Sequence, residues 1–329
     1  MAGCGNIREN PLVTSFIKSD KLKFKAKIRR SANHTEDLSA AAKPQALWRY
    51  LFLAPLAYLL LSPRVNMRLY RRLLFQPTAF PEQLNGTLPR AMDIEPEELY
   101  FNSFGDLDSK ETLHGWYFQH PNNDAPLVIF SHGNSGNLTI RAPLFQVLLE
   151  SGASVFIYDY RGFGKSTGSP TVEGVYQDGL AAYDFVVSKF ALQADQVFLY
   201  GESLGAAVSS YIASKRKSAG LVLQSGFSSL RNIGGERVRA LKLYPSWLFP
   251  MPGTSSRDIL AAEHPPLLII HGKLDKSVAF HHAQALYDCA SQPKQLLALP
   301  VSGHSDLVAT AKDTLRENLT AFFKRFSQP

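Results

Sequence analysis

The sequence feature that most constrains this chain is a short apolar run that ends in Gly-Glu-Ser-Leu-Gly and continues into a helix-forming stretch. The run Val197–Tyr200 is rich in strand formers, and the residues after Ser203 predict a helix over Leu204–Lys215. A serine at the apex of so tight a turn has strained backbone dihedral angles, so Gly201 and Gly205 must leave the space around it empty. The stretch therefore predicts a nucleophile elbow that holds the serine hydroxyl above the strand ends.

A second Gly-x-Ser-x-Gly match, Gly164–Gly168, shows how readily this five-residue pattern arises by chance. A Ser-Pro pair follows it instead of a helix-forming stretch, which predicts a loop around Ser166. It is not a phosphate-binding loop either, because the first glycine of that motif would fall on Asp159. Ser166 is thus the weaker candidate, and the alternative for Ser203 is an ordinary serine in a strand-to-helix loop.

From Leu99 onward, apolar runs suited to buried strands alternate with helix-forming stretches. This alternation predicts an α/β fold in which helices cover both faces of a mostly parallel sheet. The first two strands have no helix between them, so we expect them to pair as a hairpin. Strands are expected at 98–102, 113–118, 127–131, 154–158, 197–200, 221–224, 267–271 and 295–300, and helices at 137–151, 171–189, 204–215, 279–290 and 305–326.

Charge is distributed unevenly along the chain. Residues 1–75 carry 14 Lys and Arg against 4 Asp and Glu, whereas residues 76–329 carry 21 against 24. The body therefore gives no reason to expect nucleic-acid binding. Residues 1–45 are predicted to be a basic, disordered extension, with a basic arm drawn to anionic lipid headgroups as the functional alternative. Cys4 and Cys289 offer neither a disulfide framework nor metal-ligand spacing.

An unbroken apolar run at 51–61 is flanked by Arg49 and by further arginines from Arg64 onward. It is shorter than the roughly 18–20 residues that a spanning helix needs. Extending it from Ala46, with the arginine reaching toward the surface, brings it near that length. Residues 46–75 are therefore predicted to be a membrane anchor that spans the bilayer or lies at its surface, and a helix packed on the body is the alternative. Basic residues on both sides leave the orientation open.

The alternation of strands and helices breaks between residues 226 and 265. This segment is rich in aromatic residues and prolines without clean periodicity. It predicts a short cap over the strand ends, between the sixth and seventh strands; a satellite hydrophobic cluster under a long loop is equally consistent with the pattern.

A serine nucleophile needs a base to take its proton and a third group to orient the base. His304 is the best base, because it lies in a small-residue loop between the last strand and the last helix. Asp275 is the best acid, since it follows a buried strand on a turn that contains glycine. Asp306, beside the histidine, is expected to cap the last helix. His264, His281 and His282 are predicted to lie at the surface, and His271 is predicted to be buried beside the turn of the acid.

Acyl transfer also needs hydrogen-bond donors for the developing oxyanion. One is expected to be the backbone N–H of Leu204, directly after the serine. The other is expected to be the backbone N–H of Asn134, in a glycine-containing loop after an early strand. His132, in the same loop, is predicted to be a buried hydrogen-bonding residue.

Five sequence blocks in order now resemble a known family: His132–Asn134, Asp159–Ser166, Gly201–Gly205, His271–Asp275 and Gly303–Asp306. Together they are similar to the membrane-anchored serine hydrolases of the α/β-hydrolase superfamily, the group that includes protein depalmitoylases and lysophospholipid lipases. The order serine, aspartate, histidine is also that of α/β-hydrolases. The resemblance covers residues 80–325 and implies an eight-stranded fold, a Ser–His–Asp triad, and ester or thioester hydrolysis without a cofactor.

The sequence thus predicts a membrane-associated serine hydrolase that cleaves acyl esters or thioesters. It is expected to use Ser203, Asp275 and His304 and no metal. A peptidase or amidase on the same triad is one alternative, and a catalytically silent, membrane-tethered interaction protein is another. The oligomeric state and the natural substrate stay open.

Overall fold

The computed structural model describes residues 44–84, 90–104, 110–251 and 255–327 of the chain. The predicted basic extension, residues 1–45, lies almost wholly outside this part. The chain divides into two units, Met1–Leu59 and Leu60–Pro329.

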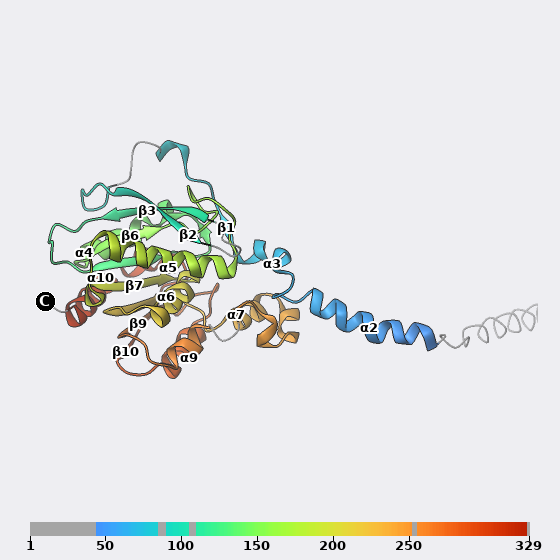
Figure 1. Cartoon of the computed structure of the whole chain (residues 1–329). Helices are drawn as coiled ribbons and strands as arrows, with labels where there is room; N and C mark the ends of the chain where they lie inside the picture. The colour runs from blue at the N-terminus through green and yellow to red at the C-terminus, as the bar shows by residue number, and fades with distance from the viewer. Residues whose placement is uncertain (1–43, 85–89, 105–109, 252–254, 328–329) are drawn as a thin grey trace, which may run out of the picture. The chain divides into compact units, whose positions relative to one another are not determined.

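The larger unit is built on an eight-stranded sheet in the order β10-β9-β8-β7-β4-β6-β3-β2 (Figure 1). Its strands are β2 (Glu97–Phe104), β3 (Lys110–Phe118), β4 (Leu127–Ser131), β6 (Ser154–Tyr158), β7 (Val197–Glu202), β8 (Gly220–Gln224), β9 (Leu267–Gly272) and β10 (Lys294–Leu299). The strands from β10 to β6 pair in parallel, whereas β3 pairs antiparallel with both β6 and β2. The predictions of an eight-stranded, mostly parallel sheet and of a hairpin between its first two strands are confirmed.

The predicted helices are present with small shifts of their ends. They are α4 (Ala142–Glu150) after the 3-10 turn η4 (Leu138–Arg141), α5 (Val172–Lys189), α6 (Leu204–Lys215), α9 (His281–Cys289) and α10 (Leu307–Phe326). The Thr171 hydroxyl accepts a hydrogen bond from the Gly174 N–H at 2.9 Å and so caps α5 at its predicted start. A further 3-10 turn, η5 (Ala194–Gln196), leads into β7.

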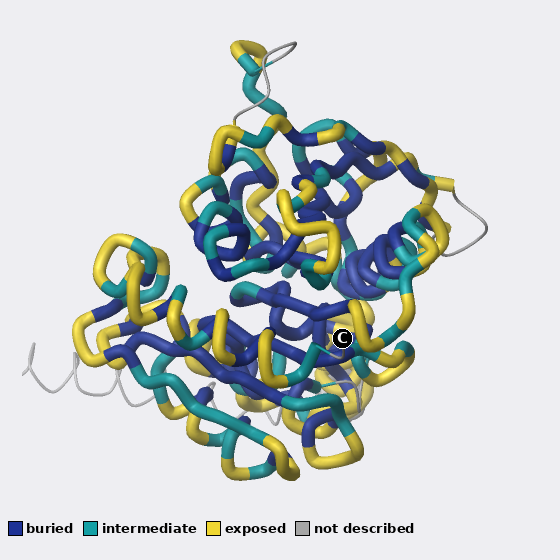
Figure 2. The backbone as a smooth tube through the Cα atoms, turned by 90° about the vertical axis from the view of Figure 1, so that its left-hand side faces the viewer, coloured by how far each residue is buried: buried dark blue, intermediate teal, exposed yellow. Residues whose placement is uncertain are grey.

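The strands β4, β6, β8 and β9 consist of buried residues, which are coloured dark blue in the tube of Figure 2. In β4, Leu127 and Ile129 join one core cluster, which includes residues of α5, α6 and α9. Val128 and Phe130 join the other, which includes residues of α4 and α10. Since alternate residues of a strand point to opposite faces, the near-continuous apolar runs in the sequence are those of strands covered on both sides.

The predicted anchor segment, residues 46–75, consists of two helices. The first, α2 (Pro44–Leu60), lies almost wholly in the N-terminal unit, and the second, α3 (Met67–Leu74), belongs to the unit that contains the sheet. Within the described ranges, no helix has both the length and the hydropathy needed to cross a membrane. After α3 come the short strand β1 (Gln76–Pro77) and the 3-10 turn η2 (Glu82–Leu84).

The segment between β8 and β9 folds into short helices: α7 (Leu230–Arg237), η6 (Arg239–Leu243), η7 (Ser246–Leu248) and α8 (Ser256–Leu260). Leu241, Tyr244, Leu248 and Phe249 form a small core of their own, against which Tyr70 of α3 packs. The backbone N–H of Arg64 donates to the Leu248 carbonyl at 2.8 Å. The approach to α3 is therefore fixed to this segment, which is called the cap below.

Candidate active site

Ser203 lies at the turn between β7 and α6 in a strained backbone conformation, with φ 54° and ψ −109°. A Cβ atom at Gly205 would overlap the carbonyl oxygen of Ser131, and one at Gly201 would overlap the carbonyl oxygen of Gly205. The Ser203 N–H donates to the Gln224 carbonyl at 2.8 Å, which ties the turn to the neighbouring strand β8. The local geometry is that of the predicted elbow.

Asp275 and His304 face each other, with Asp275 Oδ2 at 2.7 Å from His304 Nδ1. The other carboxylate oxygen accepts hydrogen bonds from the N–H groups of Ser277 and Val278, both at 2.8 Å. Burial alone would raise the pKa of the Asp275 carboxyl, but hydrogen bonds from His271, His304 and the Val278 N–H outweigh it and hold the pKa well below its usual range. An ionised carboxylate on Nδ1 favours the tautomer that leaves Nε2 free to act as a base.

Ser203 and His304 line the same cavity, whose volume is about 400 Å³. No hydrogen bond joins the two side chains in this structure, in which both residues are described. Such bonds are often long in enzymes without substrate and tighten when substrate binds. The polar groups of this cavity include Glu202, Gln224 and Ser305.

The two predicted oxyanion donors lie on elements that meet at Ser203. Leu204 is the first residue of α6, where a backbone N–H has no partner inside the helix. Asn134 lines the cavity with the serine. Its carbonyl accepts the Gln76 N–H at 2.8 Å, and its side-chain amide donates to the Leu74 carbonyl at 2.9 Å.

No pattern in the sequence predicts the contacts that hold the loop containing Asn134. Gln76–Pro77 pairs in parallel with Ser135–Gly136, which forms β5. Arg141 donates through Nε to Glu202 at 2.5 Å and through Nη2 to the Ser135 carbonyl at 3.1 Å. The residue between Gly201 and the serine is thus one half of a nearly buried ion pair that fixes the loop beside the elbow.

A second cavity, of about 560 Å³, reaches the same serine from the side of α3 and the cap. Its wall is mostly apolar and includes Met67, Leu74, Phe227, Leu230, Ile233 and Leu241. Ser203, Asn134, Gln76, Arg237 and Ser277 line both this cavity and the polar one. A polar and an apolar compartment therefore meet at the elbow, and the cap residue Arg237 lines both of them.

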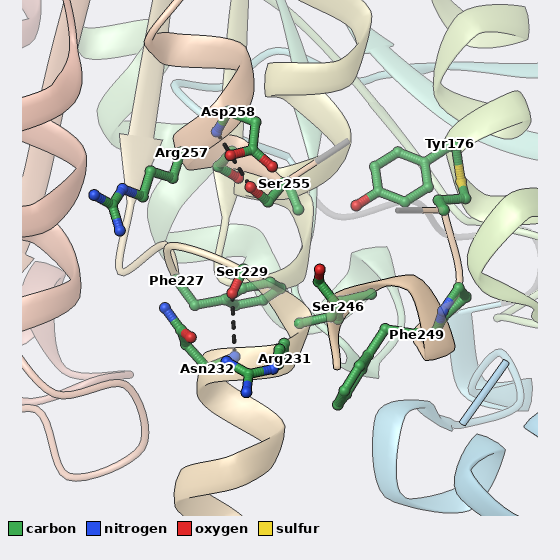
Figure 3. Close-up of a pocket in the computed structure, with 15 residues that line it drawn as sticks. Tyr176, Phe227, Ser229, Arg231, Asn232, Ser246, Phe249, Ser255, Arg257 and Asp258 are labelled. Atoms are coloured by element: carbon green, nitrogen blue, oxygen red, sulfur yellow. Dashed lines mark hydrogen bonds between the residues drawn. The ribbon is translucent and has the colours of Figure 1, made fainter. Parts of the chain in front are cut away.

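A third cavity, of about 250 Å³, lies behind the cap and is lined by none of the three predicted catalytic residues (Figure 3). Two of its serines serve as helix caps: Ser229 accepts from the Asn232 N–H and Ser255 from the Asp258 N–H, each at 3.1 Å. Phe227, Leu230, Phe249 and Pro250 line it together with the apolar cavity. These four residues form the partition between the two spaces.

Two predictions about histidines differ in outcome. His132 is fully buried as predicted, with Nδ1 at 2.7 Å from the Gly133 carbonyl. His282 was predicted to lie at the surface, and this is wrong: the residue is 1% exposed. Its Nδ1 lies 3.2 Å from the Ser228 N–H and its Nε2 3.2 Å from a carboxylate oxygen of Glu236, a cap residue. The contact with the cap, which the sequence does not reveal, buries the ring.

Within the described part of the chain, one group of side chains has metal-ligand proximity, namely Glu236, His281 and His282. His282 Nδ1 accepts the Ser228 N–H, so its proton sits on Nε2 and is donated to Glu236. That nitrogen is then engaged in a hydrogen bond instead of offering a lone pair. The group is best described as a hydrogen-bonded link between α7 and α9.

The remaining sequence candidates have structural roles. Ser166 donates to the Asp159 carbonyl at 2.8 Å and accepts the His114 N–H at 3.0 Å, away from the elbow. Asp306 occupies the N-cap position of α10, but its side chain makes no cap hydrogen bond, so the prediction that it caps the helix is wrong. It accepts the Gly303 N–H at 2.6 Å and closes the loop that carries His304.

The fold and the strand–serine–helix turn define the chain as an α/β hydrolase. The chain belongs to the family described as serine aminopeptidase, S33, whose family model matches residues 122–257. An uncharacterized protein of Mycobacterium tuberculosis is 33% identical over 238 residues, which cover 72% of this chain and 80% of that protein. Human alpha/beta hydrolase domain-containing protein 17B is 31% identical over 182 residues, which cover 55% of this chain and 60% of the human protein.

Solved structures share the fold at low sequence identity. The esterase Pf2001 from Pyrococcus furiosus matches with a TM-score of 0.62 and 19% identity, over 78% of this chain and 99% of the esterase. The acylaminoacyl peptidase from Pyrococcus horikoshii matches with a TM-score of 0.55 and 16% identity, over 76% of this chain and 44% of the peptidase. At these identities the likeness describes the fold alone.

Proposed function

We propose that this protein is a serine hydrolase that cleaves acyl esters or thioesters of amphiphilic substrates. The observation that carries the proposal is that three features meet at one point: a strained serine at the elbow, a histidine in the same cavity that pairs with a buried aspartate, and an apolar cavity that reaches the serine. The proposed mechanism uses no cofactor.

In the acylation step, Ser203 Oγ attacks the acyl carbonyl carbon while its proton passes to Nε2 of His304. Asp275 keeps the Nδ1 proton in place and stabilises the imidazolium that forms. The oxyanion is held by the backbone N–H groups of Leu204 and Asn134. The imidazolium then returns the proton to the departing alcohol or thiol, which leaves an acyl-enzyme on the serine.

In the deacylation step, water takes the place of the leaving group. His304 removes a proton from the water, whose oxygen attacks the acyl carbonyl. Collapse of the second tetrahedral intermediate breaks the bond to Ser203 and returns the proton to the serine. The carboxylic acid is released, and the serine is free again.

The two cavities suggest how the substrate is oriented. The apolar cavity of about 560 Å³ suits an acyl chain, since its wall is built of Leu, Ile, Met and Phe side chains. The cavity of about 400 Å³ that contains His304 and Glu202 suits a polar leaving group. We assign membrane association to the apolar helix that begins at Pro44, together with its basic flanks.

A fluorophosphonate probe tests the nucleophile. We expect the wild-type protein to be labelled covalently and Ser203→Ala to be unlabelled, because the probe reacts only with an activated serine. Ser166→Ala, in the second Gly-x-Ser-x-Gly match, is the matched control and keeps the label. A wild type without label, or a labelled Ser203→Ala, contradicts the assignment.

A peptidase or amidase on the same triad is a second candidate, because the matching family model is that of serine aminopeptidases. Turnover of p-nitrophenyl esters against aminoacyl anilides separates the two. Under our proposal, the ester is hydrolysed faster than the anilide. Faster hydrolysis of the anilide would instead support a peptidase or amidase. An accessible Ser203 without turnover of either substrate points instead to a catalytically silent, membrane-tethered protein.

A further inference from the structure

Helix α3 and the cap meet at one end of the larger unit (Figure 1). Both carry exposed apolar side chains. We define this docking face by its exposed apolar residues: Val65, Leu69, Leu73, Val238, Leu243 and Trp247. Trp247 is 55% exposed and Leu69 is 55% exposed, although both are large apolar side chains. A contiguous exposed apolar patch on a folded protein marks a surface that meets another molecule.

The two halves of the docking face are held together by hydrogen bonds and by side-chain packing. The Arg64 guanidinium donates to the Trp247 carbonyl at 3.0 Å, and the Arg64 N–H donates to the Leu248 carbonyl at 2.8 Å. Tyr70 of α3 packs into the small core of the cap and donates its hydroxyl to the Leu61 carbonyl at 2.7 Å. The patch is therefore a single surface of one unit.

The two segments that form the docking face are also rich in basic residues. Residues 60–76 and 226–251 together contain eight basic residues and one acidic residue, Glu236, which contacts His281 and His282. The basic residues are Arg64, Arg68, Arg71, Arg72, Arg231, Arg237, Arg239 and Lys242. Apolar side chains and a tryptophan among clustered cations have the composition of surfaces that bind anionic lipid bilayers.

The apolar cavity opens through the same surface. Leu73 and Val238 are both exposed on the docking face and both line the cavity that reaches Ser203. A molecule that leaves a bilayer at this face can therefore move its apolar part along the cavity wall without crossing water. Because the docking face and the cavity share residues, a lipid surface is favoured over a protein partner as the occupant of the face.

We infer that this face, formed by α3 and the cap, docks the protein on anionic membranes and places the cavity mouth at the lipid surface. The inference is distinct from anchoring by the helix that begins at Pro44, because it assigns a membrane contact to the folded unit. It relies on the proposed function only for what enters the cavity.

Tryptophan quenching by vesicles with brominated acyl chains tests the inference in the full chain. The protein has three tryptophans, Trp48, Trp116 and Trp247, and Trp116 is fully buried. In a Trp48→Phe background, Trp247 is then the tryptophan that can reach the lipid. We expect its emission to fall with vesicles that contain phosphatidylserine. Vesicle binding without quenching means that the face does not dock and overturns the inference.

Charge variants provide the matched comparison. Arg68→Gln, Arg239→Gln and Lys242→Gln, combined, are expected to weaken binding to phosphatidylserine vesicles about tenfold or more. The same number of charges removed elsewhere, by Lys110→Gln, Lys217→Gln and Lys324→Gln, is expected to have a much smaller effect. Equal effects of the two sets, or no vesicle binding by the full chain, contradict a lipid surface and point to a protein partner. Neither readout needs hydrolysis, so the inference can fail while the proposed function holds.

Discussion

Asp275 combines two tasks at the residue scale, because it orients His304 and also anchors its own turn. One carboxylate oxygen faces the imidazole, and the other accepts the N–H groups of Ser277 and Val278. For Asp275→Asn, we expect a near-native fold and a kcat lower by about 10³–10⁴, since the amide favours the wrong imidazole tautomer. Ester turnover measures the loss. Asp306→Asn, on the same loop as His304, is the control, and a similar loss in both variants would mean that loop distortion is responsible.

The low pKa of the Asp275 carboxyl also predicts how stability depends on pH. The pKa is lowered in the folded state, so ionisation of this group stabilises the fold above its unfolded pKa of about 3.9. That contribution is lost as the pH falls from this value through the folded pKa. We therefore expect the difference in the free energy of unfolding between wild type and Asp275→Asn, measured with denaturant, to be smaller near pH 3 than at pH 7. A difference in the free energy of unfolding that does not change with pH would contradict a lowered pKa of the Asp275 carboxyl in the folded state.

At the scale of elements, the elbow depends on close approach between α6 and β4. A Cβ atom at Gly205 would overlap the Ser131 carbonyl, and backbone cannot move aside as a flexible side chain can. Gly205→Ala is expected to lower the free energy of unfolding by more than about 3 kcal/mol. Gly152→Ala is the matched control, because Gly152 has φ +90° but open space around it. Backbone strain alone should cost about 1–2 kcal/mol there. Equal losses in the two variants would show that packing at the elbow is not the cause.

What the sequence could predict follows from how far apart the interacting residues lie. The apolar runs and the Gly-x-Ser-x-Gly turn are local patterns, so the sheet, its hairpin and the position of Ser203 could be read directly. The pairing of Gln76–Pro77 with Ser135–Gly136 and the Arg141–Glu202 ion pair could not. Each joins short, unremarkable segments some 60 residues apart, and nothing in either segment indicates its partner. The burial of His282 was missed for the same reason.

At the scale of the whole molecule, the apolar cavity is assembled from several distant parts of the chain. It is lined by α3, by the cap and by the elbow itself. Helix α3, which belongs to the predicted anchor segment, thus lines this cavity, although its sequence first indicates only a membrane anchor. Substrate selection should therefore respond to changes in α3, more than 100 residues away from Ser203 along the chain.

Met67 provides the test, since it is half-buried on α3 and lines the apolar cavity. Met67→Trp fills part of the space in which we place the acyl chain. The kcat/KM for a long-chain p-nitrophenyl ester should then fall about tenfold or more, because overpacking of the acyl chain against the larger side chain costs about 1–3 kcal/mol. The acetate ester, too short to reach α3, should be hydrolysed as by wild type. Leu69→Trp is the control, because Leu69 lies two residues further along α3, is exposed and does not line the cavity; it should leave the hydrolysis of both esters unchanged. If Met67→Trp slows both esters equally, α3 supports the fold of the site without selecting chain length.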